Sequence, residues 1–205
     1  PELPTYAKPV TLRHLLYHTS GIWDWTSLMK FAGFQRGDIV TLKQIIGFMG
    51  KQKELQFEPG SKAKFSATNY NLLAEVITRV VDMPFREYMW MKVFRPMGMK
   101  KTMVRDRHYE PVENQAYPYN FSPTRGYERT GDNISAVGSH CMFTSTEDMK
   151  KFLLNLESGK FGGPEIIKSL FTEGKLNDGK PCGFARGWKV GSFKGWKQYT
   201  ASGMW

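Results

Sequence analysis

The segment from Thr68 to Val81 constrains the fold more than any other part of the sequence. Its apolar side chains recur at intervals of three and four residues: Leu72, Leu73, Val76, Ile77, Val80 and Val81. This spacing places them on one face of an α-helix, and such a face is normally buried against other elements. A chain of 205 residues, of which 40% are hydrophobic, is long enough to bury that face within one domain.

Start signals predict further helices on both sides of this segment. Each predicted helix begins at a Ser, Thr or Pro, which are residues favoured at helix N-termini. These starts are Thr11, Thr41, Pro84, Ser145 and Pro164. The tail then changes character, because "GFARGWKVGSF" and "GWKQYTASGMW" read as short strands joined by glycine-containing turns.

Helices followed by antiparallel strands predict one α+β domain. We expect residues 1–104 to form a mainly helical subdomain, residues 105–135 a long loop, and residues 136–205 helices followed by C-terminal antiparallel strands. The loop contains four tyrosines, Tyr109, Tyr117, Tyr119 and Tyr127. We favour tyrosines that pack the loop onto the domain over a platform on which a sugar or a peptide stacks.

The formal charge of +10 raises the question of an anionic partner. Lysines and arginines are spread along the chain, and no zinc spacing or RNA-binding strand motif accompanies them. We therefore expect a solvated basic surface and no nucleic-acid partner, and we keep a basic surface-binding module as a second alternative. No stretch approaches the roughly 20 apolar residues of a transmembrane helix, so no transmembrane segment is expected.

Cysteines and histidines indicate neither a metal nor a cofactor. Cys141 and Cys182 fit two free thiols or one disulfide equally well. His14 and His18 have the spacing of neighbours on a helix, but no carboxylate or thiol follows at ligand spacing. We expect no metal site and no cofactor, and His18 is expected to have a structural role at a helix end.

Two serines lie three residues before a lysine, which is the spacing of the nucleophile in penicillin-reactive serine hydrolases. The first pair is Ser61 with Lys64, and the second is Ser27 with Lys30. A Ser-x-x-Lys pair shares a face only on a helix, whereas residues 61–67 follow the Pro59-Gly60 turn and are expected to be extended. Chance explains such pairs in a lysine-rich chain, so neither is predicted to be the nucleophile.

Four segments together resemble serine β-lactamase-like proteins, the family of class C β-lactamases, DD-peptidases, D-aminopeptidases and related esterases. These segments are "PELPTYAKPVTLRHLLYHTSGI", "FEPGSKAKFSATNYNLLAEVITRVV", "VFRPMGMKKT" and "FTSTEDMKKFLLN". The resemblance implies a β-lactamase/transpeptidase-like fold, with an antiparallel sheet flanked by helices, a largely helical subdomain, and an active-site groove between them. It also implies a bacterial protein with a periplasmic or secreted location.

The resemblance places the catalytic Ser-x-x-Lys of the family before Pro1. We therefore expect this chain to lack the N-terminal part of the fold together with the nucleophile, so no catalytic residue is assigned within residues 1–205. The second family motif, Tyr-x-Asn, aligns with Phe65, Ser66 and Ala67. Phenylalanine has no ionisable oxygen and alanine has no amide, so the proton-shuttling and carbonyl-binding roles that the resemblance implies are lost.

The third family motif, Lys-Thr-Gly or His-Ser-Gly, aligns with Ala201, Ser202 and Gly203, and its first residue is again apolar. His140 aligns with the groove wall; it is either a pocket residue or a loop histidine bonded to backbone. The candidate groove residues are Phe65, Ser66, Ala67, His140, Ala201, Ser202 and Gly203. We expect them to line one concave surface that binds a small molecule or a peptide.

These observations predict a member of the serine β-lactamase-like hydrolases. Such proteins hydrolyse amide or ester bonds of cell-wall peptide or β-lactam type through an acyl-enzyme, and the altered motifs predict impaired catalysis here. The alternative is a pseudoenzyme that keeps the groove to bind a peptide, a glycan or a protein partner without turnover.

Overall fold

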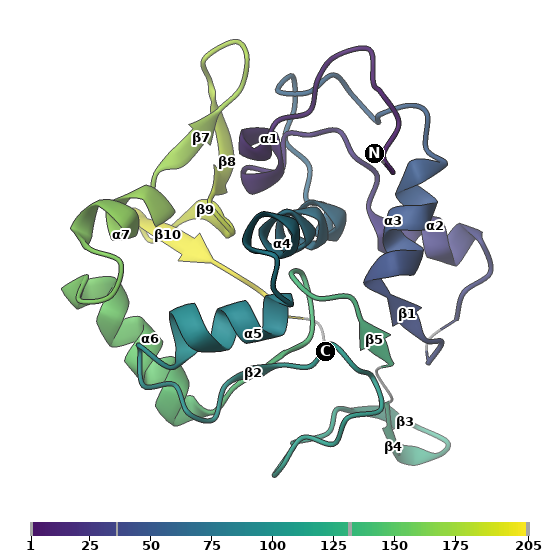
Figure 1. Cartoon of the computed structure of the whole chain (residues 1–205), viewed down its shortest axis with the longest axis vertical. Coiled ribbons are helices and arrows are strands. Elements are labelled where there is room, and N and C mark those ends of the chain that lie inside the picture. Colours follow the sequence, from purple (N-terminus) through teal and green to yellow (C-terminus); the bar gives the residue numbers. More distant parts are fainter. Residues whose placement is uncertain (1, 36, 131–132, 204–205) are drawn as a thin grey trace.

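The computed structural model describes residues 2–35, 37–130 and 133–203. The helix predicted around residues 68–81 is α4 (Ala67–Val81), which occupies the centre of the view in Figure 1. Helices α2 and α3 lie on one side of α4 in this view, and the C-terminal strands lie on the other. The remaining helices are α1 (Leu12–Leu16), α2 (Trp25–Phe31), α3 (Leu42–Gly50), α5 (Phe85–Met89), the π-helical η1 (Trp90–Phe94), α6 (Thr146–Ser158) and α7 (Pro164–Leu170).

The predicted helix starts are confirmed by their caps. The hydroxyl of Thr11 accepts a hydrogen bond from the backbone N–H of His14, and Thr41 caps α3 in the same way through Gln44. Ser145 caps α6, which ends at Gly159. Because a cap satisfies backbone N–H groups that the helix itself leaves unpaired, these residues fix the start of each helix locally.

The predicted C-terminal antiparallel sheet is also confirmed. It has four strands in the order β10-β9-β8-β7. Their bounds are β7 (Glu173–Lys175), β8 (Pro181–Ala185), β9 (Trp188–Phe193) and β10 (Trp196–Thr200). All three pairings are antiparallel. Consecutive strands pair with each other because short glycine-containing turns join them.

Two-stranded pairs link segments that are distant in the sequence. β1 (Val40–Thr41) pairs in parallel with β5 (Ile134–Ser135), and β2 (Met103–Val104) pairs antiparallel with β6 (Met142–Phe143). These pairs attach the segment that follows residue 130 to the first half of the chain. They consequently bring residues 136–140 alongside α4.

Two hydrophobic clusters flank α4. The first joins α1, α2, α3 and the start of α4, and its buried members are Leu15, Ile22, Trp25, Met29, Val40, Ile45, Met49, Ala67, Leu72 and Ala136. The second contains Ala74, Phe94, Met99, Val104 and Val137. Val80 and Val81 belong to neither cluster, and Val80 is 77% exposed. The apolar stripe of α4 is therefore buried along its N-terminal turns and leaves the core at its C-terminal end.

The segment predicted as a long loop, residues 105–135, contains an antiparallel hairpin that the sequence did not predict. Its strands are β3 (Tyr119–Ser122) and β4 (Gly126–Arg129). The expectation that the tyrosines pack this segment onto the domain is wrong for Tyr109, Tyr119 and Tyr127, which are 58–78% exposed. Short two-stranded pairing holds the hairpin, so its rings need no contact with the core.

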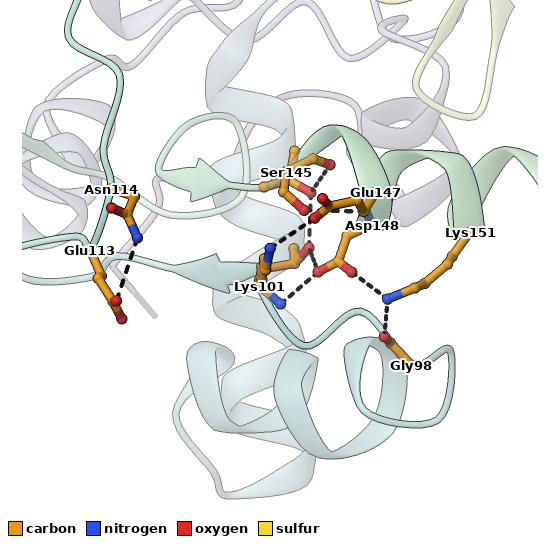
Figure 2. Close-up of polar contacts among 10 residues, drawn as sticks. Gly98, Lys101, Glu113, Asn114, Ser145, Glu147, Asp148 and Lys151 are labelled. Carbon is orange, nitrogen blue, oxygen red and sulfur yellow. Dashed lines mark hydrogen bonds and ion pairs between the residues drawn. The ribbon is translucent and has the colours of Figure 1, made fainter.

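A buried carboxylate attaches α6 to the segment before β2 (Figure 2). Asp148 is 1% exposed and accepts hydrogen bonds from the backbone N–H of Lys101 at 2.6 Å and from the hydroxyl of Thr102 at 3.0 Å. Lys151 forms an ion pair with Asp148 at 2.7 Å. Burial raises the pKa of Asp148, but the hydrogen bonds from Lys151, the Lys101 amide and Thr102 outweigh it and hold the pKa below its usual value.

The remaining sequence expectations concern cysteines, metals and membranes. Cys141 and Cys182 are free thiols. Across residues 2–35, 37–130 and 133–203, no cluster of three metal-ligating side chains occurs. Within the same residues, no helix combines the length and the apolar character needed to cross a bilayer.

Candidate functional site

The candidate site surrounds the N-terminus of α4. Ser66, the N-cap residue, is extended, and its hydroxyl does not cap the helix. The carboxylate of Asp24 takes that place, because its Oδ2 accepts a hydrogen bond from the backbone N–H of Ala67 at 2.6 Å. Asp24 also caps α2 by accepting from the backbone N–H of Thr26 at 2.9 Å. One carboxylate therefore holds the first turns of two helices together.

Three polar side chains in the first turns of α4 are fully buried, and each bonds to a different segment. The hydroxyl of Thr68 accepts from the backbone N–H of Trp25 at 2.9 Å. Asn69 accepts from the hydroxyl of Ser20 at 2.7 Å. Asn71 donates to two backbone carbonyls of the segment that follows β5, at 3.0 and 2.7 Å. Buried polar groups with complete hydrogen bonding fix the relative positions of these segments.

Sequence reasoning did not identify Asp24, Thr68, Asn69 and Asn71 as organising residues. The available signal was the run of polar residues Thr68, Asn69 and Asn71 immediately before an apolar helix face. Such a run is typical of a solvated helix start, so the sequence alone does not separate the two cases. The complete burial of Thr68, Asn69 and Asn71 becomes visible only in the structure.

His18 lies beneath the site and is 3% exposed. Its Nδ1 accepts from the backbone N–H of Ser66 at 3.3 Å, and the Nδ2 of Asn69 lies 3.2 Å from the same atom. Because Ser20 donates to the amide oxygen of Asn69, the amide presents its N–H to His18. Nδ1 therefore carries no proton, and His18 is neutral with its proton on Nε2.

Burial lowers the pKa of His18 from 6.5 to about 4, against smaller opposing effects of Asp24 and of the hydrogen bond with Ser66. Three aromatic rings account for this burial. The ring centroids of Phe65, Tyr70 and Phe184 lie 4.8, 5.3 and 4.9 Å from that of His18. Phe184 belongs to β8, so His18 joins the helical part to the sheet. This arrangement supports the structural role expected for His18.

Phe65 covers the ring of His18 and is itself 62% exposed. It is the one member of the predicted Phe65-Ser66-Ala67 motif with a solvent-accessible side chain. Ser66 and Ala67 are 1% and 3% exposed, and Ala67 belongs to the first hydrophobic cluster. The position that the resemblance assigns to a tyrosine oxygen is thus occupied at the surface by an apolar ring.

A relay of hydrogen bonds orients His140. The amide of Asn71 donates to Ala136 and Val137, so its Oδ1 must accept the proton of the Ser139 hydroxyl, 2.9 Å away. His140 Nδ1 lies 2.7 Å from the same hydroxyl, whose proton is already committed to Asn71. Nδ1 must therefore donate, and a neutral His140 carries its lone pair on Nε2. Whether His140 is a pocket residue or a loop histidine stays a prediction.

Trp25 connects His140 to the α4 N-terminus. Its ring meets the imidazole of His140 edge-on at 5.5 Å, and its backbone N–H donates to Thr68. The Trp25 side chain is 4% exposed, and its indole N–H has no hydrogen-bond partner within the described part of the chain. The structure thus brings Phe65, Ser66, Ala67 and His140 around one helix start, and their role in a groove stays a prediction.

The third predicted segment, Ala201–Gly203, follows β10 and is exposed. In the part of the chain that the structure describes, no hydrogen bond joins it to α4. Its place in the same groove as Phe65 therefore also stays a prediction.

The two Ser-x-x-Lys pairs form no serine–lysine hydrogen bond among the described residues. The hydroxyl of Ser61 donates to the carbonyl of Glu58 at 2.7 Å, and the amine of Lys64 donates to Gln56 at 2.6 Å. Ser27 and Lys30 lie on an exposed face of α2. Ser61 and Lys64 are therefore each bonded to other groups, and Ser27 and Lys30 are exposed neighbours on a helix.

Comparison with known proteins agrees with this arrangement. A family model described as Beta-lactamase matches residues 1–205. The chain belongs to the beta-lactamase family. Penicillin-binding protein 4* of Bacillus subtilis is 27% identical over 192 residues, which cover 87% of this chain and 42% of that protein.

Solved structures of other proteins show the same fold. The D-stereospecific amidohydrolase of a Streptomyces species superposes with a TM-score of 0.73 at 23% identity, covering 92% of this chain and 59% of that one. The octameric penicillin-binding protein homologue of Pyrococcus abyssi gives a TM-score of 0.77 at 22% identity, covering 95% and 46%. The β-lactamase/transpeptidase-like fold is thus confirmed, and this chain spans less than half of its curated relatives.

Proposed function

We propose that this beta-lactamase-family chain forms the wall of a ligand groove that lacks the acid–base groups of an efficient serine hydrolase. The observation that carries the proposal is Phe65. Its ring lies at the surface over the neutral His18, in the position that the resemblance assigns to a proton-shuttling tyrosine. A phenyl ring neither accepts nor donates a proton, so a serine at this site would have no oxygen partner here.

The proposed ligand class follows from the relatives, whose names describe penicillin binding and hydrolysis of D-amino acid amides. We infer an amide or ester of cell-wall peptide or β-lactam type as the ligand. General acid–base groups contribute about 100- to 10,000-fold each to a rate. The combined replacements at Phe65, Ala67 and Ala201 therefore predict little turnover even in the presence of a serine nucleophile.

A pseudoenzyme is the second candidate, and one observation favours it. The supporting network of Asp24, Thr68, Asn69 and Asn71 is fully hydrogen-bonded, although the polar ends of the motif are replaced. These bonds would hold the proposed groove wall in place even though the resemblance predicts that its proton-transfer groups are replaced. This combination supports binding of a peptide, a glycan or a protein partner without turnover.

A covalent-labelling experiment tests the proposal on the longest natural protein that contains this chain. The protein is incubated with a fluorescent penicillin, and adducts are measured by mass spectrometry. We expect no stoichiometric adduct and no ester hydrolysis above background. Stoichiometric labelling of any serine in the protein without substitutions would refute the proposal that acylation is impaired.

A set of variants tests whether the loss of acid–base groups causes the proposed impairment of hydrolysis. Phe65→Tyr, Ala67→Asn and Ala201→His are introduced singly and together, and ester hydrolysis is compared with that of Phe31→Tyr. Phe31 is a matched control because it is 84% exposed and lies on α2. A gain with the combined variant, but not with the control, supports loss of acid–base groups as the cause. Circular dichroism checks that the buried Ala67 position tolerates asparagine.

A further inference from the structure

The β9–β10 hairpin lies at one edge of the C-terminal sheet (Figure 1), and two exposed aromatic rings flank its turn. The turn residues Lys194 and Gly195 have φ values of 47° and 83°, as in the tight turns that favour hairpins. Phe193 and Trp196 are paired in register across the strands, so their side chains lie on one face. They are 60% and 81% exposed.

The sequence around this turn is basic. From residue 179 to residue 203 the chain has five basic residues and no Asp or Glu, whereas the whole chain has 29 basic and 19 acidic residues. Lys189 and Lys194 form no ion pair within the described part of the chain. Lys197 pairs in register with Ser192, so it lies on the face opposite Trp196, where it meets Glu173 at 3.9 Å. The amine of Lys194 lies over the ring of Phe193, 5.5 Å from its centroid.

We propose that the Phe193–Trp196 hairpin tip docks onto an anionic lipid bilayer, with both rings at the interface and Lys189 and Lys194 facing the headgroups. Tryptophan is enriched at membrane–water interfaces because its ring is apolar and its N–H is polar. Each lysine near an anionic leaflet strengthens partitioning about fivefold. This surface is independent of the α4 site and of the proposed function.

The shape of the tip favours a bilayer over a single-stranded nucleic acid. Proteins that bind single strands use a basic groove along which the backbone runs, with rings stacked against successive bases. Here the two rings flank a two-residue turn at the end of a hairpin, which is a projecting feature and offers no groove. A planar surface can meet both rings and the adjacent lysines together.

Vesicle sedimentation tests the proposal with the whole chain. Vesicles of phosphatidylcholine alone are compared with vesicles that also contain phosphatidylglycerol, at low and high salt. We expect binding only to the anionic vesicles and a steep loss with salt. The variant with Phe193→Ala and Trp196→Ala is expected to bind at least about tenfold more weakly, and the variant with Lys189→Glu and Lys194→Glu about as much.

Matched controls separate the hairpin from the general charge of the chain. Phe31→Ala removes an equally exposed ring on α2, and Lys62→Glu with Lys160→Glu makes the same charge change elsewhere. Both controls are expected to bind like the unmodified protein. Quenching by brominated lipid is expected to be lost with Trp196→Phe, which keeps a ring at this position.

Four results would overturn the proposal. These are absence of binding to anionic vesicles, equal weakening by the hairpin and control variants, tighter binding of a single-stranded oligonucleotide at the same salt, and self-association that protects Trp196 from aqueous quencher without lipid. Far-ultraviolet circular dichroism of each variant confirms that the sheet is intact. Exposed surface variants of this kind are not expected to unfold the domain.

Discussion

Lowering the pH should destabilise this protein through His18 well before its carboxylates are protonated. In the folded chain, burial lowers the pKa of His18 from 6.5 to about 4. As the pH falls below 6.5, the unfolded chain therefore takes up a proton that the folded chain refuses. The stabilisation is complete above pH 6.5 and is lost as the pH falls towards 4.

The size of the effect follows from the two pKa values. Their difference, from 6.5 to about 4, corresponds to about 3 kcal/mol at roughly 1.4 kcal/mol per pH unit. Between about pH 7 and about pH 4.5, some 2.5 kcal/mol of unfolding free energy should be lost from this group alone. That is a large part of the stability of a typical domain.

Urea denaturation at the two pH values measures the loss, and NMR titration of the imidazole measures the pKa directly. His18→Asn is the comparison variant, because His18 has a φ of 56° and asparagine tolerates this left-handed conformation. All other titratable groups, including His14, are common to both proteins, so the difference between their pH slopes isolates His18. A ring that titrates near 6.5, or an equal loss in the variant, would refute the reasoning.

Three further predictions concern the supports of the fold and site. Asp148→Ala should lower the unfolding free energy by about 3 kcal/mol, measured by urea denaturation, because it leaves buried donors of the Lys101–Thr102 segment unpaired. Gly21→Ala should cost at least about 2 kcal/mol in thermal unfolding, because φ is 75° and an added Cβ would collide with the Phe57 carbonyl. Ser139→Ala should move the neutral His140 proton from Nδ1 to Nε2, observed in imidazole nitrogen chemical shifts.

Each of these predictions has a control or a contrary outcome. Glu147→Gln breaks an exposed ion pair and should lower the unfolding free energy by less than about 1 kcal/mol. A loss as large as that of Asp148→Ala would contradict the argument from the buried hydrogen bonds of Asp148. Gly33 has a similar φ of 87°, but an added Cβ there would meet open space. Gly33→Ala should therefore lower the unfolding free energy less than Gly21→Ala. A His140 that already carries its proton on Nε2 in the unmodified protein would contradict the Asn71 relay.

Local chemistry explains which parts of the fold were predictable. The caps at Thr11, Thr41 and Ser145 bond to residues three positions away, and the glycine turns join neighbouring strands, so short windows of sequence contain the information. The β3–β4 hairpin (residues 119–129) was missed because its aromatic rings are exposed and the alternation of aromatic and polar residues in β3 extends over only four residues. Tyrosine content alone does not distinguish a packed loop from an exposed hairpin.

The sequence by itself determined the helix starts, the antiparallel tail and the family resemblance, because short windows of residues contain that information. The loss of proton-transfer groups at Phe65 and Ala67 stays a prediction from the motif alignment. Only the tertiary structure decided which polar residues organise the site. Asp24 and His18 meet the α4 N-terminus from more than 40 positions away. Neutral His18 and the relay to His140 arise from burial and from hydrogen-bond partners that only folding brings together.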